Sequence, residues 1–374
     1  MILQGARVAL GESEGVRLDL TIRRGKVWFG KHAADGPALD LHGHLILPGL
    51  INAHDHLEFN LFRRLGSPPY ANATEWALDI YRPDRSPVRE QLRIPKSVRL
   101  RWGGVKNLLS GVTTVMHHNP YETGVFGPGF PVRVVSRYGW AHSPRFSPDF
   151  RKRYTRAPFA IHACEGSDAA ARREAGLLEE AGVLGENTVM VHGVALDEAG
   201  IALMKRRGAG LVWCPSSNLF TLGQTISKQV LDSGIPMALG TDSALTAAGD
   251  LLDELRVAAA YATPQRLYRM VTRDAARLLH LEAGEGEIRE GGRADLLVLR
   301  DLGVTPAEAL LSARPEMVII GGKIHLLALE SAPGGAGIQP ALRPLRLEGR
   351  GTFLARAAHG VPEGSRLAGK KVAA

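Results

Sequence analysis

Four apolar runs, each followed by ionisable side chains, constrain the fold of this chain more than any other feature. The runs and the residues after them are Leu45 to Ala53 before His54 and His56, Phe159-Ala160-Ile161 before His162, Val189-Met190-Val191 before His192, and Met237-Ala238-Leu239 before Asp242. Residues i and i+2 of a strand point to the same face, so His54 and His56 can present two imidazoles to one ion. The strands of a parallel α/β barrel all end on one face, where the chemistry lies. The pattern therefore predicts four strand ends around one polar mouth.

The chain divides into regions that differ in sequence pattern and composition. Residues 1–50 and 285–330 contain short apolar runs separated by glycine-containing turns, and together they predict a small β-sandwich built from both ends of the chain. Residues 51–284 alternate strand-like and helical patterns, which predicts βαβ units and a metal-binding α/β barrel. Residues 331–374 are rich in Gly, Pro, Ala and Arg without a clear period, and they predict an extended basic tail.

The region 119–158 is the weak part of the predicted barrel. Eight strands require two in this region, and only one convincing candidate occurs there, around Tyr138 to Ser143. We therefore expect a distorted (β/α)8 TIM barrel that is irregular on this side.

Charge and apolar content exclude several partners. The net charge is +8, but the segment 331–374 carries +5 of it, and no basic stripe is interleaved with aromatic residues. We therefore expect no nucleic-acid partner. The apolar runs are too short to span a bilayer, and no secretory signal pattern opens the sequence, so we expect a cytoplasmic protein without a membrane partner.

The cysteine content limits the kind of metal site. Only Cys164 and Cys214 occur, which offers neither a disulfide framework nor a thiolate site without other ligands. A metal in this chain would therefore be held by nitrogen and oxygen atoms.

A set of motifs then resembles the amidohydrolase superfamily, and within it the mononuclear branch that contains cytosine, adenosine and guanine deaminases and triazine hydrolases. The motifs are Pro48-Gly49-Leu50-Ile51-Asn52-Ala53-His54-Asp55-His56, Gly111-Val112-Thr113-Thr114-Val115, His162-Ala163-Cys164-Glu165, Val191-His192-Gly193, Ser217-Asn218-Leu219, Ala238-Leu239-Gly240-Thr241-Asp242 and Gly292-Arg293-Ala294-Asp295-Leu296. The resemblance covers about residues 1–325, and it identifies no particular substrate.

The resemblance implies that His54, His56, His162 and Asp242 bind one divalent metal ion. Three neutral imidazoles and a carboxylate suit Zn²⁺, with Fe²⁺ or Mn²⁺ as alternatives, and leave a position for water. Relatives with two metals need a bridging carboxylated lysine or a glutamate near the fourth strand. Neither occurs around Trp140-Ala141-His142-Ser143, so we expect a single metal.

The resemblance also implies roles in hydrolysis by a metal-activated water. Asp242 would orient that water and take its proton, His192 would hydrogen-bond it and steady the developing oxyanion, and Glu165 would protonate the ring nitrogen or leaving group.

Four further residues are candidates for contacts with the substrate, each with a structural alternative. His142 resembles a substrate-facing histidine of many relatives, and it could equally make a structural hydrogen bond. Trp76 matches a segment that covers the site in several deaminases, or it packs in the core. Asn218 could contact the substrate or fix a turn. His117 and His118 should point to opposite faces of a strand, so one of them, His118, could reach the pocket.

We expect an enzyme that hydrolyses a C–N bond other than a peptide bond in a small molecule, most simply the deamination of an amino-heterocycle. Two alternatives stay open: an amidase or ureido hydrolase that uses the same metal site, and a non-catalytic ligand-binding protein that retains the fold. Homo-oligomers are possible, and the sequence does not settle the substrate.

Overall fold

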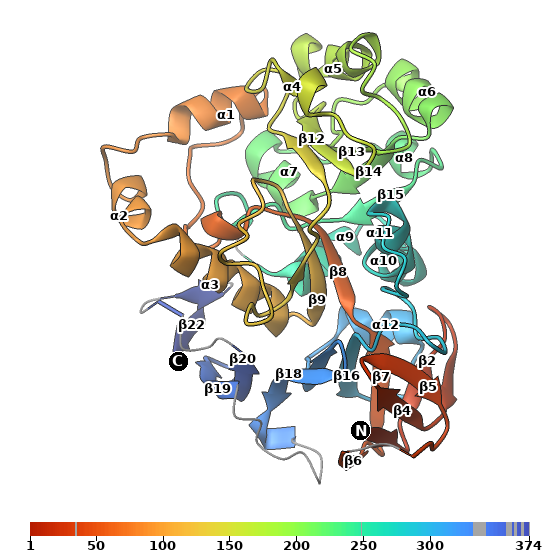
Figure 1. Cartoon of the computed structure of the whole chain (residues 1–374). Coiled ribbons are helices and arrows are strands. Elements are labelled where there is room, and N and C mark those ends of the chain that lie inside the picture. The colour runs from red at the N-terminus through yellow and green to blue at the C-terminus, as the bar shows by residue number, and fades with distance from the viewer. Residues whose placement is uncertain are drawn as a thin grey trace.

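The computed structural model describes residues 1–33, 36–247, 249–331, 342–356, 361–362, 365–367 and 370–373. Its helices and parallel strands lie at one end of the molecule, and antiparallel sheets built from both ends of the chain lie at the other (Figure 1). No helix within these ranges is both long enough and apolar enough to cross a membrane.

Eight strands follow one another along the middle of the chain and pair only in parallel. They are β8 (Leu50–Asp55), β9 (Val112–His117), β10 (Arg133–Val134), β11 (Gly139–Ala141), β12 (Phe159–Ala163), β13 (Thr188–His192), β14 (Gly210–Trp213) and β15 (Met237–Leu239). β8, β9 and β10 form one sheet, and β11 to β15 form a second sheet in sequence order. A single parallel bridge between Asp55 and Asp242 links the first sheet to the end of the second.

Most of these strands are buried along their whole length, because helices cover their outer face. The helices are α1 (Ala73–Ile80), α2 (Val88–Leu92), α3 (Lys96–Leu109), α4 (Phe150–Arg153), α5 (Ala169–Glu180), α6 (Glu198–Arg207), α7 (Pro215–Leu222), α8 (Lys228–Leu231), α9 (Leu251–Ala258), α10 (Pro264–Met270), α11 (Arg273–Leu278) and α12 (Pro306–Leu311), with the short 3-10 helices η1 (Leu57–Phe59) and η2 (Leu329–Ser331). Asp197 caps the start of α6, and Gly208 ends it with a φ of 71°.

The other part contains a four-stranded and a ten-stranded sheet, both antiparallel except for one parallel pair of neighbouring strands in each. The smaller sheet has the order β5 (Lys26–Phe29), β4 (Leu20–Arg23), β1 (Ile2–Gln4) and β6 (Ala38–Asp40). The larger sheet has the order β21 (Arg366–Leu367), β22 (Lys370–Ala373), β19 (Leu342–Leu347), β20 (Gly351–Arg356), β18 (Lys323–Ala328), β17 (Met317–Ile320), β16 (Leu296–Arg300), β7 (His44–Pro48), β2 (Arg7–Ala9) and β3 (Gly15–Arg17).

Two features of this fold differ from the sequence-based expectation. Between residues 119 and 158 the chain forms two strands, β10 and β11, where the sequence offered one; β10 has only two residues and pairs with β9. The segment predicted as an extended tail contributes β19 to β22 to the ten-stranded sheet, because β20 finds an antiparallel partner in β18. Residues 332–341 of that segment lie outside the described residues.

Candidate metal centre and active site

The carboxyl ends of four parallel strands bring the predicted ionisable residues together. His54 lies near the end of β8 and His56 directly after it, His162 lies on β12, and His192 is the last residue of β13. Asp242 follows β15 by three residues. His192 and Asp242 have φ angles of 80° and 57°, in the left-handed region that costs a non-glycine residue about 1–3 kcal/mol. The fold therefore holds these two side chains in strained backbone positions.

Three imidazoles and one carboxylate point to a common centre. The Nε2 atom of His162 lies 3.2 Å from that of His54 and 3.3 Å from that of His56. The Oδ1 atom of Asp242 lies 3.7 Å and 3.6 Å from the Nε2 atoms of His54 and His56. Ligands at the corners of a tetrahedron, about 2.1 Å from an ion, are roughly 3.4 Å from one another. The spacing of the four donor atoms fits one divalent ion.

Burial favours the uncharged form of His56 and His162, which is the form that binds a metal. All three ligand histidines are less than a tenth exposed. Burial, followed by the charge of neighbouring histidines, holds the pKa values of His56 and His162 well below 6.5. In the tautomer that carries its hydrogen on Nδ1, each of these rings presents the lone pair of its Nε2 atom to a cation at this centre.

Two hydroxyl groups orient the carboxylate of Asp242. Its Oδ2 atom accepts hydrogen bonds from Ser217 at 2.6 Å and from Thr246 at 2.8 Å, which leaves Oδ1 directed at the histidines. Burial alone would raise the pKa of Asp242, but its interactions with the neighbouring histidines His54, His56 and His192 outweigh burial and lower the pKa. Asp242 is therefore an anion at neutral pH.

Glu165 and His192 form a buried pair beside Asp242. Oε2 of Glu165 lies 3.4 Å from Nε2 of His192. Burial, reinforced by the negative charge of Asp242, raises the pKa of Glu165 well above 4.5, whereas burial lowers the pKa of His192 to about 4. Burial thus favours the protonated form of the Glu165 carboxyl group, and the imidazole of His192 is uncharged at neutral pH.

Asn218 lies behind His192 and fixes its tautomer. Nδ1 of His192 donates to Oδ1 of Asn218 at 2.8 Å, so the neutral ring presents an unprotonated Nε2 toward Glu165. This differs from the expected stabilisation of an oxyanion by His192, which needs a hydrogen on Nε2. It also places Asn218, which is fully buried, behind the histidine rather than against a substrate.

A cavity of about 560 Å³ opens over this centre. The predicted residues that line it are His56, Trp76, His142, His162, Glu165, His192 and Asp242. Much of the remaining wall is apolar and was not predicted, and it comes from Phe59, Ala73, Ala77, Leu78, Ile80, Tyr81, Trp140, Phe146 and Leu245. Trp140 and Phe146 flank His142 in sequence, which is the one signal that could have revealed them.

His118 lies elsewhere than expected. It is fully buried, its ring stacks on that of His162 with centroids 4.2 Å apart, and a ring nitrogen lies within 4.8 Å of donor atoms of His54, His56 and His162. Both of its nitrogens contact protein atoms, Nδ1 with Nδ1 of His54 and Nε2 with the carbonyl oxygen of Ala141. β9 ends at His117, so His117 and His118 point to opposite sides, and His117 faces Glu58 at 3.5 Å. His118 therefore lies behind the ligands and outside the cavity wall.

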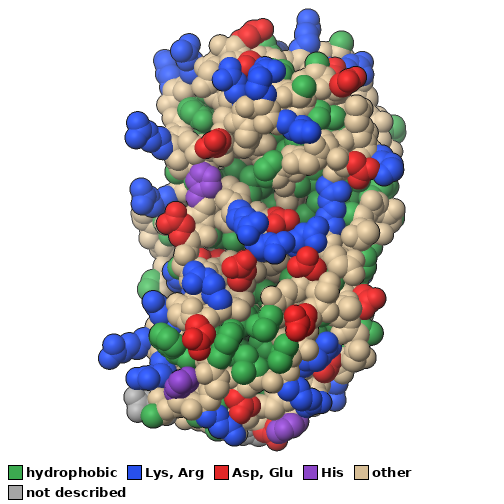
Figure 2. All heavy atoms as spheres, turned by 90° about the vertical axis from the view of Figure 1, so that its right-hand side faces the viewer, with side chains coloured by type: hydrophobic (Ala, Val, Ile, Leu, Met, Phe, Trp, Pro, Cys, Tyr) green, Lys and Arg blue, Asp and Glu red, His purple; other side chains and the backbone are tan. Residues whose placement is uncertain are grey.

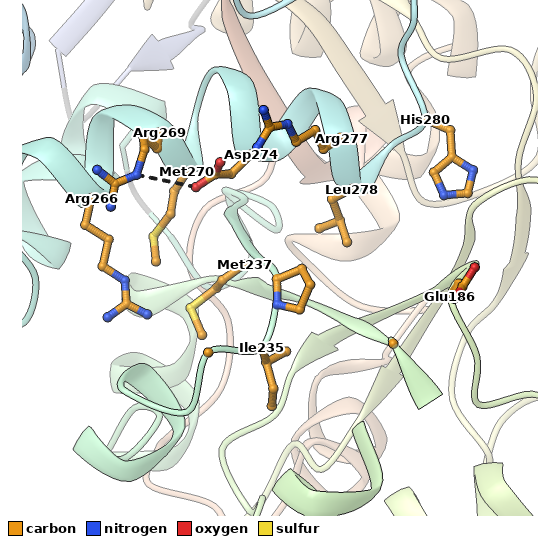
Figure 3. Close-up of a pocket in the computed structure, with 13 residues that line it drawn as sticks. Glu186, Ile235, Met237, Arg266, Arg269, Met270, Asp274, Arg277, Leu278 and His280 are labelled. Carbon is orange, nitrogen blue, oxygen red and sulfur yellow. Dashed lines mark ion pairs between the residues drawn. The ribbon is translucent and has the colours of Figure 1, made fainter. Parts of the chain in front are cut away.

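A second hollow, of about 480 Å³, lies at the opposite ends of the strands, near the start of β15 (Figure 3). Arg266, Arg269, Asp274 and Arg277 reach it from α10 and α11, and Arg269 pairs with Asp274 at 3.7 Å. From this side, Lys and Arg side chains form an arc across the middle of the surface, with acidic side chains beside it (Figure 2). The histidine centre opens elsewhere, so we assign the active site to the first cavity.

This chain is similar in sequence to several known proteins. The sequence profile of the amidohydrolase family matches residues 150–325. A 5-methylthioadenosine/S-adenosylhomocysteine deaminase of Syntrophobacter fumaroxidans is 27% identical over 80% of this chain and 78% of its own length. A protein of the same name from Pyrococcus furiosus is 27% identical over 90% of this chain and 92% of its own length.

Solved structures show the same fold. An adenosine deaminase from Xanthomonas campestris with bound zinc matches with a TM-score of 0.70 at 18% identity, over 87% of this chain and 92% of that one. A zinc complex of atrazine chlorohydrolase from Arthrobacter aurescens matches with a TM-score of 0.67 at 18% identity, over 90% of this chain and 97% of the other.

Proposed function

We propose that this chain, which carries an amidohydrolase-family domain, is a metal-dependent hydrolase that removes an amino group from a small heterocycle. The observation that carries the proposal is the tetrahedral spacing of His54, His56, His162 and Asp242 beneath a cavity that is also lined by the carboxyl group of Glu165, whose pKa is raised by burial. The eight parallel strands support a distorted (β/α)8 barrel, with the antiparallel sheets from both ends of the chain as its β-sandwich.

The chain's own residues supply the proton transfers. A divalent ion in the site, zinc in preference to iron or manganese, would lower the pKa of water from about 15.7 toward 7. Asp242 is an anion with Oδ1 directed at the same centre, so it can accept a proton from the attacking water.

Glu165 is the acid of the reaction. Its protonated carboxyl can donate to a ring nitrogen of the heterocycle while water adds to the carbon that bears the amino group. Nε2 of His192 lies 3.4 Å from Oε2 of Glu165 and helps to position the carboxyl group at the cavity. The C–N bond then breaks: the amino group leaves as ammonia with the proton that Asp242 took from the water, and the hydroxyl group of the adduct returns a proton to Glu165 as it becomes the carbonyl group.

The cavity wall favours a substrate with an apolar group beside its heterocycle. Among the described residues that line the cavity, Glu165 and Asp242 are the only carboxylates, and α1 contributes Trp76, Leu78 and Ile80, with Tyr81 directly after it. A thioether or alkyl group would be buried against this wall, which favours binding by about 25 cal/mol for each Å² of apolar surface removed from water. 5-Methylthioadenosine, named for the relatives, has this combination of amino-heterocycle and thioether, and we propose it as the first substrate to test.

The same donor set could hydrolyse a cyclic amide or ureide, so the experiment must identify the bond that breaks. We would measure the zinc content per chain, and then screen 5-methylthioadenosine, adenosine, aminopyrimidines, alkylamino-triazines and cyclic ureides for ammonia release. Mass spectrometry of the product should show oxygen in place of the exocyclic nitrogen. One zinc per chain with such a product supports deamination, ring opening supports the amide alternative, and full activity in metal-free protein would overturn both.

A further inference from the structure

His118 is a buried histidine that the proposed reaction does not use. It follows β9 directly, it is 0% exposed, and it lies between two parts of the active site: the ligand His54 and the strand β11. Its Nδ1 atom lies 3.2 Å from Nδ1 of His54, and its Nε2 atom lies 2.8 Å from the carbonyl oxygen of Ala141. Both ring nitrogens are therefore in hydrogen-bonding contact.

These two contacts determine where the hydrogens lie. A carbonyl oxygen can only accept, so Nε2 of His118 must carry a hydrogen and donate it to Ala141. A neutral imidazole has one N–H group, so Nδ1 of His118 is an acceptor. The atom that faces it, Nδ1 of His54, must then be the donor.

The position of the hydrogen on His54 determines which of its nitrogens can bind a metal. With its hydrogen on Nδ1, His54 has a free lone pair on Nε2, and Nε2 is the atom that lies 3.2 Å from Nε2 of His162 and 3.7 Å from Oδ1 of Asp242. We propose that His118 is a positioning residue that holds His54 in the tautomer and ring orientation needed to bind the metal, through a relay from the carbonyl of Ala141 to His118 to His54.

The surroundings fix this relay in one geometry. The ring of His118 stacks on His162 with an interplanar angle of 9°, and its edge approaches Trp140 at 6.0 Å. The rings of His54 and His118 are perpendicular at 90°, with their Nδ1 atoms 3.2 Å apart. Ala141 pairs with Ile161 beside His162, so the strand that carries one ligand also places the carbonyl that anchors the relay.

The geometry also distinguishes this role from direct ligation. His118 belongs to the group of histidines whose donor atoms lie within 4.8 Å of one another. However, its Nδ1 faces the nitrogen of His54 that points away from Asp242, and its Nε2 is occupied by Ala141. A partner that sets the tautomer of a metal-bound histidine typically contributes 10–100-fold to metal affinity.

A matched pair of variants separates the two ends of the relay. In His118→Asn, the side-chain oxygen can take the place of Nδ1 and accept from His54. In His118→Gln, the amide reaches the place of Nε2 and can still donate to Ala141, but the acceptor for His54 is lost. His118→Phe removes both contacts and retains a ring to stack on His162.

We would titrate the metal-free variants with zinc against a chelator of known affinity and record the absorption spectra of their cobalt complexes. We expect His118→Asn to bind zinc within a few-fold of the unsubstituted chain and to keep its cobalt spectrum. We expect His118→Gln and His118→Phe to bind 10–100-fold more weakly. Thermal unfolding of the metal-free proteins should not separate Asn from Gln.

Two results would overturn the inference. Unchanged zinc affinity in His118→Gln and His118→Phe would show that the acceptor has no effect. A cobalt spectrum altered in His118→Asn as strongly as in His118→Phe would show that His118 is itself a ligand. The inference rests on His54 as a ligand of the proposed centre, so failure of the unsubstituted chain to bind zinc would overturn the proposed function as well, whereas either result above leaves it intact.

Discussion

At the scale of single residues, the sequence predicts groups that follow a periodic pattern and misses those that act through distant partners. The strand-end positions of His54, His56 and His162 could be read from the apolar runs before them, whereas the family resemblance implied their role as ligands, and the three imidazoles share one centre. The hydroxyls of Ser217 and Thr246 orient Asp242, yet serine and threonine are too common beside turns for their sequence to signal this. Only the folded chain shows which hydroxyl meets which carboxylate.

The first residue-scale prediction concerns Glu165. Glu165→Gln removes the proton that the buried carboxyl donates, so we expect kcat to fall by about 10²–10⁴-fold. The zinc content should stay the same, because Glu165 is not among the four ligand donors. Glu186→Gln, an exposed glutamate near the other hollow, is the control. Turnover within two-fold of the unsubstituted chain in Glu165→Gln would contradict the assignment.

The second residue-scale prediction concerns Glu174, on α5. Burial raises its pKa to about 7, while its Oε2 accepts from the backbone N–H of Cys164 at 2.6 Å. An acid whose pKa is higher in the folded than in the unfolded chain binds more protons in the folded state. The contribution of Glu174 to the free energy of unfolding is therefore greatest below about pH 4.5 and falls as the pH rises to about 7. A difference of one pKa unit corresponds to about 1.4 kcal/mol, so the free energy of unfolding should fall by up to roughly 3 kcal/mol.

The measurement is denaturant unfolding of Glu174→Gln and the unsubstituted chain at pH 5 and pH 8. Glutamine keeps an oxygen for the Cys164 N–H and cannot ionise, so we expect the variant to gain stability relative to the unsubstituted chain between the two pH values. Glu180→Gln, an exposed position on the same helix, should not change that difference. An equal pH dependence in all three chains would rule out the buried ionisation.

At the scale of elements, the parallel strands with polar ends were predicted from sequence, and β10 was not. β10 has two residues, Arg133 and Val134, and a strand of that length has no alternation to detect. Its pairing with β9 depends on tertiary contact alone.

The closeness of β8 to the end of β15 is another tertiary property: a Cβ added at Gly240 would lie 2.7 Å from Cβ of His54 and 2.9 Å from its carbonyl oxygen.

Gly240→Ala therefore tests whether this close approach sets the metal site. The added methyl group must displace His54, so we expect weaker zinc binding and a loss of about 1–3 kcal/mol in the free energy of unfolding. Gly11→Ala is the matched control, because nothing lies within 4 Å of the Cβ that it adds. Zinc affinity that is equal in both variants would show that β8 tolerates the displacement.

At the scale of the whole molecule, composition gave the wrong picture of the C-terminal segment. Its glycine, proline and arginine content indicated a tail, but strands are stabilised by their partners, and β18 supplies a paired edge for β20. Leu342, Leu345 and Leu347 of β19 are less than 5% exposed, and Arg350 lies 3.5 Å from the buried carboxylate of Asp250, which caps α9. The segment thus packs against the sheet and the helical part at once.

The corresponding prediction is that Leu345→Ala destabilises the chain. Leu345 is fully buried, so truncation should cost about 2–5 kcal/mol in chemical or thermal unfolding. Leu302→Ala, at a leucine that is 56% exposed, should cost far less. If both substitutions left the unfolding midpoint unchanged, the strands from Leu342 onward would not belong to the cooperative core.

The junction between β7 and β8 has a consequence for how the ligands are aimed. β7 ends at Pro48 in the ten-stranded sheet, and β8 starts at Leu50 and carries His54 four residues later, with only Gly49 between them. β7 is aligned with β16 by five residue pairs, from His44 opposite Arg300 to Pro48 opposite Leu296. Because one residue separates the two strands, the register of β7 against β16 fixes the point at which β8 begins, while the pairing of β8 with β9 fixes which way its side chains face. A sheet that contributes no ligand thus anchors the strand that carries two of them.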